Sequence, residues 1–348
     1  MPANLKIGIP TVSLSKPGLH SLDHKLRSAA HGFAGIELFI DDLSHFASSS
    51  FNGSLTQAAK YISSLAKQLN LTFICLQPFG FYEGLVDTNQ STYLLTEKLP
   101  LWFAIARIIG TDLIQIPANF LQNDPVTGAA RTSGDIRLIV SDLQTIADIG
   151  VKQGFRFVYE ALCWSTHVDT WEAAWNVVKL VDRENFGICL DSFNTRTPLP
   201  SLGRRRMLSK PWPSPWRRSV LSSPVENWTS GKSSTSSLSM ASGCRRRWTR
   251  STPFMWRANP RRMSWSRNAR LFPCEEERGG YLPVLEIARA FFEIGFEGWV
   301  SLELFSRTCN DPDVNTVGEH ARRGMDRRRR VVAALGLDVE VPARNCEC

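Results

Sequence analysis

The sequence predicts an eight-stranded α/β barrel, the (β/α)8 or TIM-barrel fold, with one strand region disrupted. Outside residues 203–262, short apolar runs alternate with longer amphipathic stretches, which is typical of a parallel sheet covered by helices. The chain has 348 residues and is long enough for one large barrel. No glycine-rich phosphate-binding fingerprint follows any apolar run, which argues against the alternative of a doubly wound open sheet.

The expected strands are short, mostly apolar runs, as strands buried on both faces require. In chain order they are Lys6–Ile9, Gly35–Phe39, Leu71–Leu76, Leu113–Ile116, Arg156–Tyr159, Phe186–Leu190 and Trp299–Leu302. The expected helices are longer stretches in which apolar residues recur every three to four positions. They include Leu55–Leu69, Thr96–Ile109, Ile136–Gln153, Val168–Val181 and Leu282–Phe292. Seven strands are counted, and only the gap from Leu190 to Trp299 is long enough to contain an eighth.

Residues 203–262 do not follow this pattern. They include fourteen Lys and Arg residues and one acid, Glu226, so their formal charge is +13 against +8 for the whole chain, and the remainder carries −5. A structureless connection of this length is unusual inside a compact barrel. We therefore expect a barrel over residues 1–325 in which the basic, Ser/Arg/Trp-rich residues 195–261 are disordered, followed by a C-terminal tail at 326–348. The Arg327–Arg330 run is expected to be a solvated helix face.

A shifted reading frame would account for the basic segment. If each true codon joins the last base of one codon to the first two bases of the next, several residues are forced: Trp228–Thr229 gives Asp and Met240–Ala241 gives Gly. Permitted codons then allow Thr229–Cys244 to read D-V-G-K-I-F-Y-I-Q-L-V-D-G-E-R-M. This is an apolar strand ending in polar residues, as the missing eighth strand should be. The stretch from Thr195 to about Lys210 does not decode in this way.

Bulk properties narrow the class of protein. The hydrophobic content of 43% is that of a soluble globular protein. No run of 18 or more apolar residues is present, and Met1–Ile9 has no apolar signal segment. The eight Cys residues are irregularly spaced and form neither a metal ribbon nor a small disulfide scaffold. We expect a cytoplasmic protein that binds neither nucleic acid nor a membrane.

Polar side chains follow the expected strands, at the barrel edge where active sites lie. They are Glu37, Gln77, Glu160, Asp191 and Glu303. An acid directly after a buried strand is costly unless it is paired, hydrogen-bonded or bound to a cation. For any single acid, pairing with a nearby Lys or helix N-terminus is an equally good interpretation. Three acids at the ends of separate strands predict an oxygen-rich site for Mg²⁺, Mn²⁺ or a similar divalent ion.

Several long segments resemble the fungal 3-dehydroshikimate dehydratases, which belong to the xylose-isomerase-like barrel superfamily. The segments are Ile74–Gly84, Phe157–Asn194, Met263–Glu275 and Gly295–Arg307. The resemblance implies a lyase that dehydrates 3-dehydroshikimate to protocatechuate in quinate catabolism. It also implies a divalent metal held by two Glu, one Asp and one Gln, and it assigns three of these ligands to Glu160, Asp191 and Glu303.

This chain departs from the family at the fourth ligand. The Gln belongs at the end of the strand before the last one, where this chain has Ser236–Ser237, and a serine hydroxyl is a poor substitute. The resemblance further implies that Ser266 and Arg270 contact the substrate, with Arg270 as a bidentate clamp for its carboxylate. Without the resemblance, a solvated loop arginine is the simpler interpretation of Arg270.

Other residues near the expected mouth are candidates for proton transfer and substrate binding. Glu37 and His167 are the candidate bases, although His167 precedes a helix, where a capping or packing role is equally plausible. Asn194 and Gln77 are expected to bind the substrate. Tyr82 lies in a loop over the site and is expected to bind the substrate or gate its entry.

Two other functions have some support in the sequence. A sugar isomerase or epimerase of the same superfamily would share the metal site, but the segments ICLQPFGFYEG and ARLFP favour the dehydratase. A nucleic-acid-binding protein would use the basic, Trp-containing residues 203–262, and salt-dependent binding by that peptide would support it.

A missing strand would open the barrel and expose the backbone of its neighbours. We therefore expect the chain as written to fold poorly and to have little dehydratase activity. Sequencing the transcript across codons 190–265 tests the reading-frame hypothesis. A strand of the kind K-I-F-Y-I-Q-L-V-D is expected, whereas a transcript that encodes SSTSSLSM would contradict the hypothesis.

Overall fold

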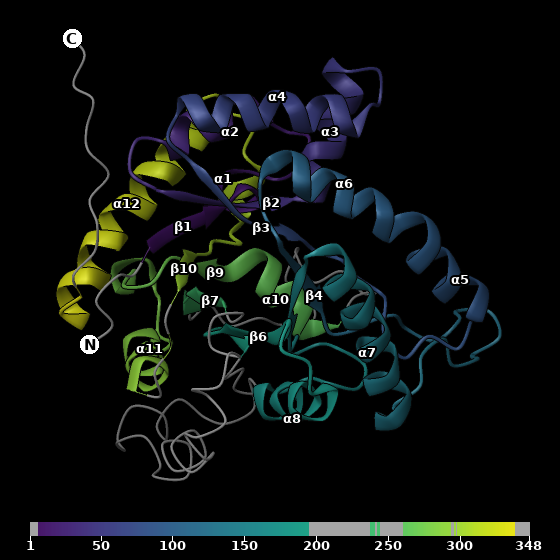
Figure 1. Ribbon diagram of the computed structural model, residues 1–348. Helices are drawn as coiled ribbons and strands as arrows, with labels where there is room; N and C mark the ends of the chain where they lie inside the picture. The colour runs from purple at the N-terminus through teal and green to yellow at the C-terminus, as the bar shows by residue number, and fades with distance from the viewer. Residues whose placement is uncertain are drawn as a thin grey trace, which may run out of the picture.

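Eight parallel strands close into a barrel in the order β1, β10, β7, β6, β5, β4, β3, β2, with helices around it (Figure 1). The computed structural model describes residues 6–194, 237–240, 242–243, 260–293, 296 and 298–337, and of 237–240 and 242–243 only the backbone. The barrel strands are β1 Lys6–Pro10, β2 Gly35–Phe39, β3 Thr72–Gln77, β4 Leu113–Pro117, β5 Arg156–Glu160, β6 Phe186–Asp191, β7 Ser237–Met240 and β10 Trp299–Leu302. The predicted (β/α)8 fold is therefore confirmed.

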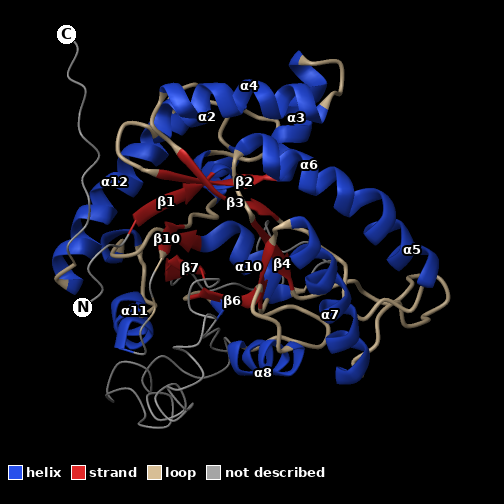
Figure 2. Ribbon diagram, viewed as in Figure 1, coloured by secondary structure: helices blue, strands red, loops and turns tan. Residues whose placement is uncertain are grey.

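Helices pack around the outside of the barrel (Figure 2). They are α1 Thr11–Leu14, α2 Leu22–Ala29, α3 Ile40–Ser50, α4 Leu55–Gln68, α5 Thr88–Tyr93, α6 Leu99–Ile109, α7 Ile136–Gln153, α8 Trp171–Val181, α10 Arg261–Ala269, α11 Val284–Glu293 and α12 Thr316–Leu335. A π-helical turn, η1 Leu94–Lys98, leads into α6, and 3₁₀ turns occur at η5 Glu276–Arg278 and η6 Arg307–Asn310. The short antiparallel pair β8 Ser242–Gly243 and β9 Arg270–Leu271 lies outside the barrel sheet.

Local sequence sets where the longest helices begin and end. The Asp135 side chain accepts a hydrogen bond from the Arg137 amide and so caps the start of α7. Ser54 caps α4 in the same way. Helices α6 and α7 end at Gly110 and Gly154, which adopt left-handed φ values of 81° and 77°, a conformation that glycine accommodates without steric cost.

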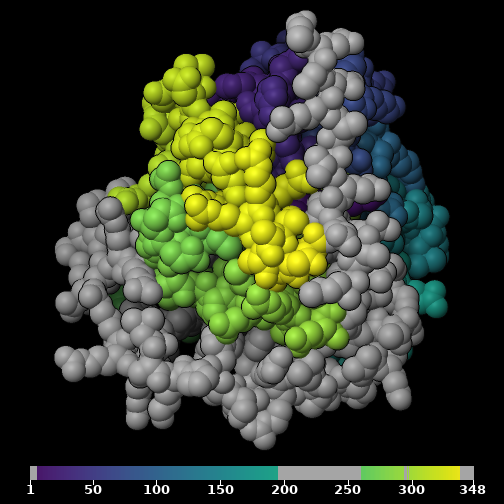
Figure 3. All heavy atoms as spheres, turned by 90° about the vertical axis from the view of Figure 1, so that its left-hand side faces the viewer, coloured from purple at the N-terminus to yellow at the C-terminus, as the bar shows by residue number. Residues whose placement is uncertain are grey.

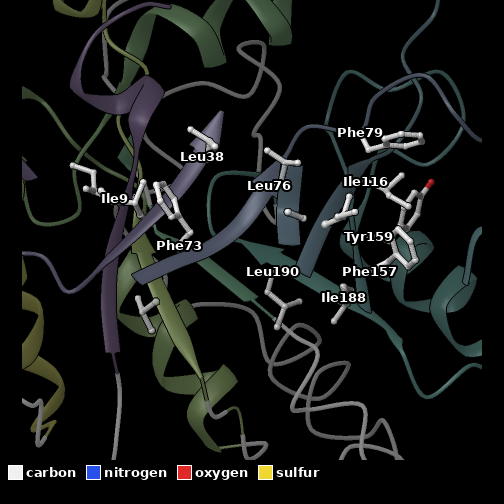
Figure 4. Close-up of a cluster of buried hydrophobic side chains, with 14 of the residues drawn as sticks. Ile9, Leu38, Phe73, Leu76, Phe79, Ile116, Phe157, Tyr159, Ile188 and Leu190 are labelled. Carbon is white, nitrogen blue, oxygen red and sulfur yellow. The ribbon is translucent and has the colours of Figure 1, made fainter. Parts of the chain in front are cut away.

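The side chains on the two faces of the strands pack in different places. Outward side chains pack against the helices and form the main hydrophobic core (Figure 4). Among them are Leu38, Leu76, Ile116, Tyr159 and Leu190. A second, small cluster of Cys75, Leu113, Val158 and Cys189 lies on the opposite face, because the register pairs Cys75 with Glu37 and Cys189 with Glu160. The barrel interior is therefore filled by apolar side chains below a polar end.

Strand β7 closes the barrel at the position for which no apolar run was found. It pairs in parallel with β6 through Leu190 and Leu238, and with β10 through Val300 and Leu238. The expectation that the barrel would open here was wrong, because backbone hydrogen bonding does not depend on the apolar character of the strand. The predicted disorder of residues 195–261 was also wrong for β7, β8 and the start of α10, while the rest of that stretch lies outside the described residues.

The C-terminal helix α12 is part of the fold. It runs from Thr316 to Leu335 and packs on α1, α2 and α11, and Figure 3 shows it (yellow) lying between the N-terminal and the later segments of the chain. The predicted tail boundary at residue 326 was therefore wrong for residues 326–337, and residues 338–348 lie outside the described residues. The predicted solvated face was wrong for Arg327, which is buried and donates to the Cys274 carbonyl at 2.8 Å and to Glu277 at 2.5 Å.

A buried ion pair anchors α12. Glu275, in the turn before η5, is fully buried and accepts two hydrogen bonds from Arg323 of α12, at 3.0 and 2.9 Å. It also accepts a bond from the Phe272 amide at 3.1 Å. All of these donors approach one carboxylate, which compensates for its removal from water.

The described part of the chain gives two further facts about its class. None of its helices is long and apolar enough to cross a membrane. Within it, Cys75, Cys189, Cys274 and Cys309 are free thiols. Burial raises the pKa of Cys309 to about 11, so this thiol stays protonated near neutral pH.

We predict that Glu275→Ala destabilises the fold by about 3–5 kcal/mol, because it leaves the Arg323 guanidinium buried without its carboxylate. The free energy of unfolding in urea measures the effect. The control is Glu319→Gln. It removes an exposed ion pair with Arg322 within α12, the helix that carries Arg323, and is expected to change the free energy of unfolding by less than about 1 kcal/mol. Equal effects of the two substitutions would show that the buried pair does not anchor α12.

Candidate active site

Four acidic side chains gather at the carboxyl end of the barrel. Glu37 is the third of the five residues of β2, Glu160 and Asp191 are the last residues of β5 and β6, and Glu303 directly follows β10. All four are buried, with exposed fractions of 2–8%. Like charges so deeply buried repel each other and lose hydration, so they require donors or a cation close by.

Arg270 supplies that cation. This residue begins β9 and is only 2% exposed. Its Nη1 atom lies 2.9 Å from Asp191 Oδ2 and also contacts Glu303 Oε2. The interpretation of Arg270 as a solvated loop residue is therefore wrong, and the structure brings it together with two of the predicted ligands.

Ser266 and an aromatic ring hold the Arg270 guanidinium in place. Its Nε atom donates to Ser266 Oγ at 2.8 Å, one helical turn earlier on α10. The guanidinium carbon lies 4.3 Å from the centroid of the Phe193 ring, within the range of a cation–π contact. Ser266 is thus buried beside the cluster, where it orients Arg270.

Asn194 links the acidic side chains. Its Nδ2 atom donates to Asp191 Oδ2 and lies 3.3 Å from Glu160 Oε1. Its Oδ1 atom accepts a bond from the Cys163 amide at 3.1 Å, which fixes the orientation of the side chain. Asn194 lies in the site as predicted, but in the described structure its polar atoms already serve the carboxylates and the backbone.

Glu37 and Gln77 form a separate pair on neighbouring strands. Gln77 Nε2 donates to Glu37 Oε2 at 2.6 Å. Burial raises the pKa of Glu37 to about 7, although the neighbouring Ser301 and Gln77 side chains oppose the shift. Glu37 is therefore close to half protonated at neutral pH, which is the property of a group that can both accept and return a proton.

Glu160 has the strongest electrostatic conflict in the cluster. Burial is the largest cause that raises its pKa well above the ordinary value, the negative charge of Asp191 adds to it, and Arg270 opposes it. A nearby divalent cation would act in the same direction as Arg270 and favour the ionised form. The protonation of Glu160 thus depends on which cation occupies the mouth.

Gln115 belongs to the site and was missed in the sequence. It lies on β4, 7% exposed, and its Nε2 atom donates to Glu160 Oε2. Its Oε1 atom is buried and has no hydrogen-bond partner in the part of the chain that the structure describes. The available signal was a Gln inside the apolar run LIQIP, at the alternate position that faces the barrel interior.

The donor atoms fit a hard divalent cation in kind. Carboxylate oxygens from three strands and an unpartnered amide oxygen of Gln115 form an oxygen-rich set, as Mg²⁺ and Mn²⁺ prefer. Over the described residues, no group of three or more His, Cys, Asp or Glu side chains is arranged to hold a metal ion. The residues therefore fit the cation chemically, while the Arg270 guanidinium binds Asp191 and Glu303.

The serine predicted at the fourth ligand position begins β7. Ser237 pairs with Cys189, and Ser236 lies outside the described residues. The register partner of Asp191 is Ser239, which also pairs with Ser301. The position level with the acidic ligand is thus two residues later than predicted, and it is again a serine.

His167 and Tyr82 are not brought into the acidic cluster. His167 is exposed, with its Nε2 atom 3.1 Å from Thr132 Oγ1, and its ring packs against Gly134 so closely that a side chain there would clash. Tyr82 is 2% exposed, and its hydroxyl donates to the Asp142 carbonyl at 2.6 Å. The structure gives His167 a contact between two loops and Tyr82 a contact with helix α7, and the roles predicted for them stay predictions.

Glu83, beside Tyr82, connects the loop after β3 to the loop after β4 and to strand β5. Its Oε1 atom accepts bonds from the Asn119 amide at 2.5 Å and from the Tyr159 hydroxyl at 3.0 Å. Burial raises the pKa of Glu83 to about 7. The loop after β3 is thus tied to the loop after β4 by a carboxyl group whose charge changes near neutral pH.

Comparisons with known proteins agree with this geometry. A family model described as the xylose isomerase-like TIM barrel matches residues 26–201. A 3-dehydroshikimate dehydratase of Neurospora crassa is 40% identical over 365 residues, covering 98% of this chain and 97% of the relative.

Solved structures share the fold. A xylose isomerase-like TIM barrel/4-hydroxyphenylpyruvate dioxygenase fusion protein matches with a TM-score of 0.71 and 25% identity, over 96% of this chain and 43% of that protein. The IolI protein, solved with a bound zinc atom, matches with a TM-score of 0.65 and 17% identity, over 94% of this chain and 98% of that protein.

We predict that Glu83→Gln removes part of the pH dependence of stability. A carboxyl pKa raised from 4.5 to about 7 means that the folded chain binds the proton more tightly than the unfolded chain. The free energy of unfolding therefore falls as pH rises through this window. Relative to the parent, the variant should gain up to about 3 kcal/mol at pH 8 and little near pH 4.5.

Urea unfolding at several pH values measures this difference. The control is Glu97→Gln, the same chemical change at an exposed position, which should leave the pH dependence unaltered. A Glu83→Gln profile parallel to that of the parent chain would contradict the role given to Glu83.

Proposed function

The chain belongs to the xylose isomerase-like TIM-barrel family and to its 3-dehydroshikimate dehydratases, and from this premise we propose that it is a hydro-lyase that uses a divalent metal to convert 3-dehydroshikimate into protocatechuate. The observation that carries the proposal is the buried cluster of Glu160, Asp191 and Glu303 at the ends of β5, β6 and β10. A full-length relative at 40% identity with this printed activity supports it.

Glu160, Asp191 and Glu303 would hold the metal. When bound, a divalent cation supplies Lewis-acid stabilisation of negative charge on the substrate's ketone oxygen. Asn194 orients Asp191, and Gln115 orients Glu160, through the hydrogen bonds of their amide groups. These amides keep the carboxylate oxygens in fixed directions, as supporting residues around metal sites do.

Glu37 is proposed to move the proton. The reaction removes a proton from the carbon next to the ketone and expels a ring hydroxyl as water, and the ring then becomes aromatic. Glu37 has a pKa of about 7, so its carboxylate can accept the carbon-bound proton and its acid form can return a proton to the leaving hydroxyl. Gln77 fixes its orientation through the 2.6 Å hydrogen bond.

Arg270 and Ser266 are proposed to receive the substrate carboxylate. A guanidinium binds a carboxylate through two parallel hydrogen bonds, which sets the orientation as well as the affinity. The chain has Ser236–Ser237 where the resemblance places the family's Gln, and a serine hydroxyl is a weaker ligand than an amide oxygen. We propose that this lowers metal affinity and activity in this chain relative to a chain in the shifted reading frame.

The alternative functions have less support. A sugar isomerase or epimerase would use a comparable metal site, but the relative that matches over nearly the full chain is a dehydratase. Nucleic-acid binding would depend on residues 203–262, most of which lie outside the described residues. That function stays a prediction, and salt-dependent binding would support it.

We predict that the purified chain, stripped of metal with a chelator, regains formation of protocatechuate from 3-dehydroshikimate when Mn²⁺ or Mg²⁺ is added. Ultraviolet absorbance of the aromatic product measures this recovery.

Asp191→Asn should lower turnover by at least about 100-fold and weaken Mn²⁺ binding in calorimetry. The matched control is Asp112→Asn, a half-exposed acid at the opposite end of the barrel that pairs with Arg156. Turnover that is unaffected by the chelator would contradict the metal-dependent reaction.

A further inference from the structure

Arg270 contacts the same carboxylates that the proposed function gives to the metal. Its Nη1 atom lies 2.9 Å from Asp191 Oδ2 and in contact with Glu303 Oε2. The Arg270 and Asp191 side chains are exposed by no more than 2%. A guanidinium stays charged at any physiological pH, so it acts here as a permanent internal cation.

A divalent metal and this guanidinium compete for these two oxygen atoms. Two cations at neighbouring positions in a buried site repel each other strongly because the surrounding dielectric constant is low. A carboxylate oxygen that accepts an N–H hydrogen bond also has one of its lone pairs directed to the donor, which makes it a weaker metal ligand. Metal binding through these oxygen atoms of Asp191 and Glu303 is therefore favoured when the guanidinium leaves.

The surroundings of Arg270 allow such a movement of the side chain alone. Its backbone is held in β9, where the amide donates to the Phe305 carbonyl at 3.0 Å. Two aromatic faces lie beside the guanidinium, Phe193 at 4.3 Å and Phe305 at 5.4 Å. Either ring can keep a cation–π contact with the guanidinium while the hydrogen bonds from the guanidinium to the acids are broken.

We propose that Arg270 is the resident cation of the acidic cluster when no metal is bound, and that its displacement by the metal frees it to bind the substrate's carboxylate. The inference rests on the proposed function for the identity of the metal ligands. It adds a coupling between the two binding events. Metal binding releases Arg270 to bind the substrate's carboxylate. A carboxylate bound to Arg270 in turn removes the guanidinium from the metal ligands. Each binding event therefore raises the affinity for the other ligand.

Calorimetric titration of the metal-free full chain with MnCl₂ tests the competition directly. Arg270→Gln removes the competing cation, and we expect it to bind Mn²⁺ at least about 10-fold more tightly than the parent chain. Arg270→Lys keeps a positive charge and is therefore expected to bind Mn²⁺ more weakly than Arg270→Gln does. The matched control is Arg262→Gln on α10, whose guanidinium contacts the Cys163 carbonyl and Asp169, and it should leave the affinity unchanged.

The coupling has a second readout that needs no substitution. Shikimate has the ring carboxylate but no ketone to react, and we expect it to tighten Mn²⁺ binding by the parent chain several-fold. In Arg270→Gln this effect should be lost. Circular dichroism melting establishes that each variant is folded.

The outcomes separate this inference from the proposed function. A folded Arg270→Gln that binds Mn²⁺ no more tightly than the parent, together with no effect of shikimate, overturns the role of Arg270. Absence of Mn²⁺ binding in every folded variant overturns it together with the metal site. If the predicted affinities are found but the loaded enzyme forms no protocatechuate, the competition stands and only the proposed reaction fails.

Discussion

Compensation of buried negative charge is the constraint on which the barrel mouth depends. Parallel strands end at one edge, so the acids that follow β5, β6 and β10 come together in a space from which water is largely excluded. Removing carboxylates from water costs several kcal/mol each unless charge and hydrogen bonds replace the lost hydration. Arg270, Asn194 and Gln115 provide that replacement in the described structure. The amide and guanidinium groups around the acids therefore have a physical reason to lie there before any ligand is considered.

Two buried arginine–carboxylate groups in the described part of the chain differ in how completely their hydrogen bonds are satisfied, and this difference distinguishes a structural ion pair from a candidate binding site. Glu275 receives two hydrogen bonds from Arg323 and a third from a backbone amide, so both of its oxygens are satisfied within the fold. Arg270 instead divides one Nη1 atom between Asp191 and Glu303. A fully satisfied pair holds a helix in place. A shared donor among several acids leaves an arrangement that another cation can replace.

Strand β7 shows that closing the barrel and supplying a metal-ligand side chain are different requirements. Closure needs only backbone hydrogen bonds to β6 and β10, which a serine-rich strand can make. Ligand supply needs a particular side chain at a particular level of the strand. The chain meets the first requirement with Ser237–Met240, but it has Ser236–Ser237 where the family resemblance calls for an amide.

Periodicity and strand-end polarity predicted most of the fold and the acidic strand ends, because both are local properties of the chain. Seven strands were located within one or two residues, and the strand-end rule gave Glu37, Glu160, Asp191 and Glu303, of which the family resemblance assigned the last three to the metal. Other features were decided only by the tertiary structure. The burial of Arg270 and Arg327, the entry of Gln115 into the site and the removal of His167 and Tyr82 from it depend on contacts between residues far apart in sequence. The same polar side chain is a solvated loop residue or a buried counter-ion according to which residues pack against it. Those residues are distant in the sequence, so the sequence alone does not show which of them come into contact.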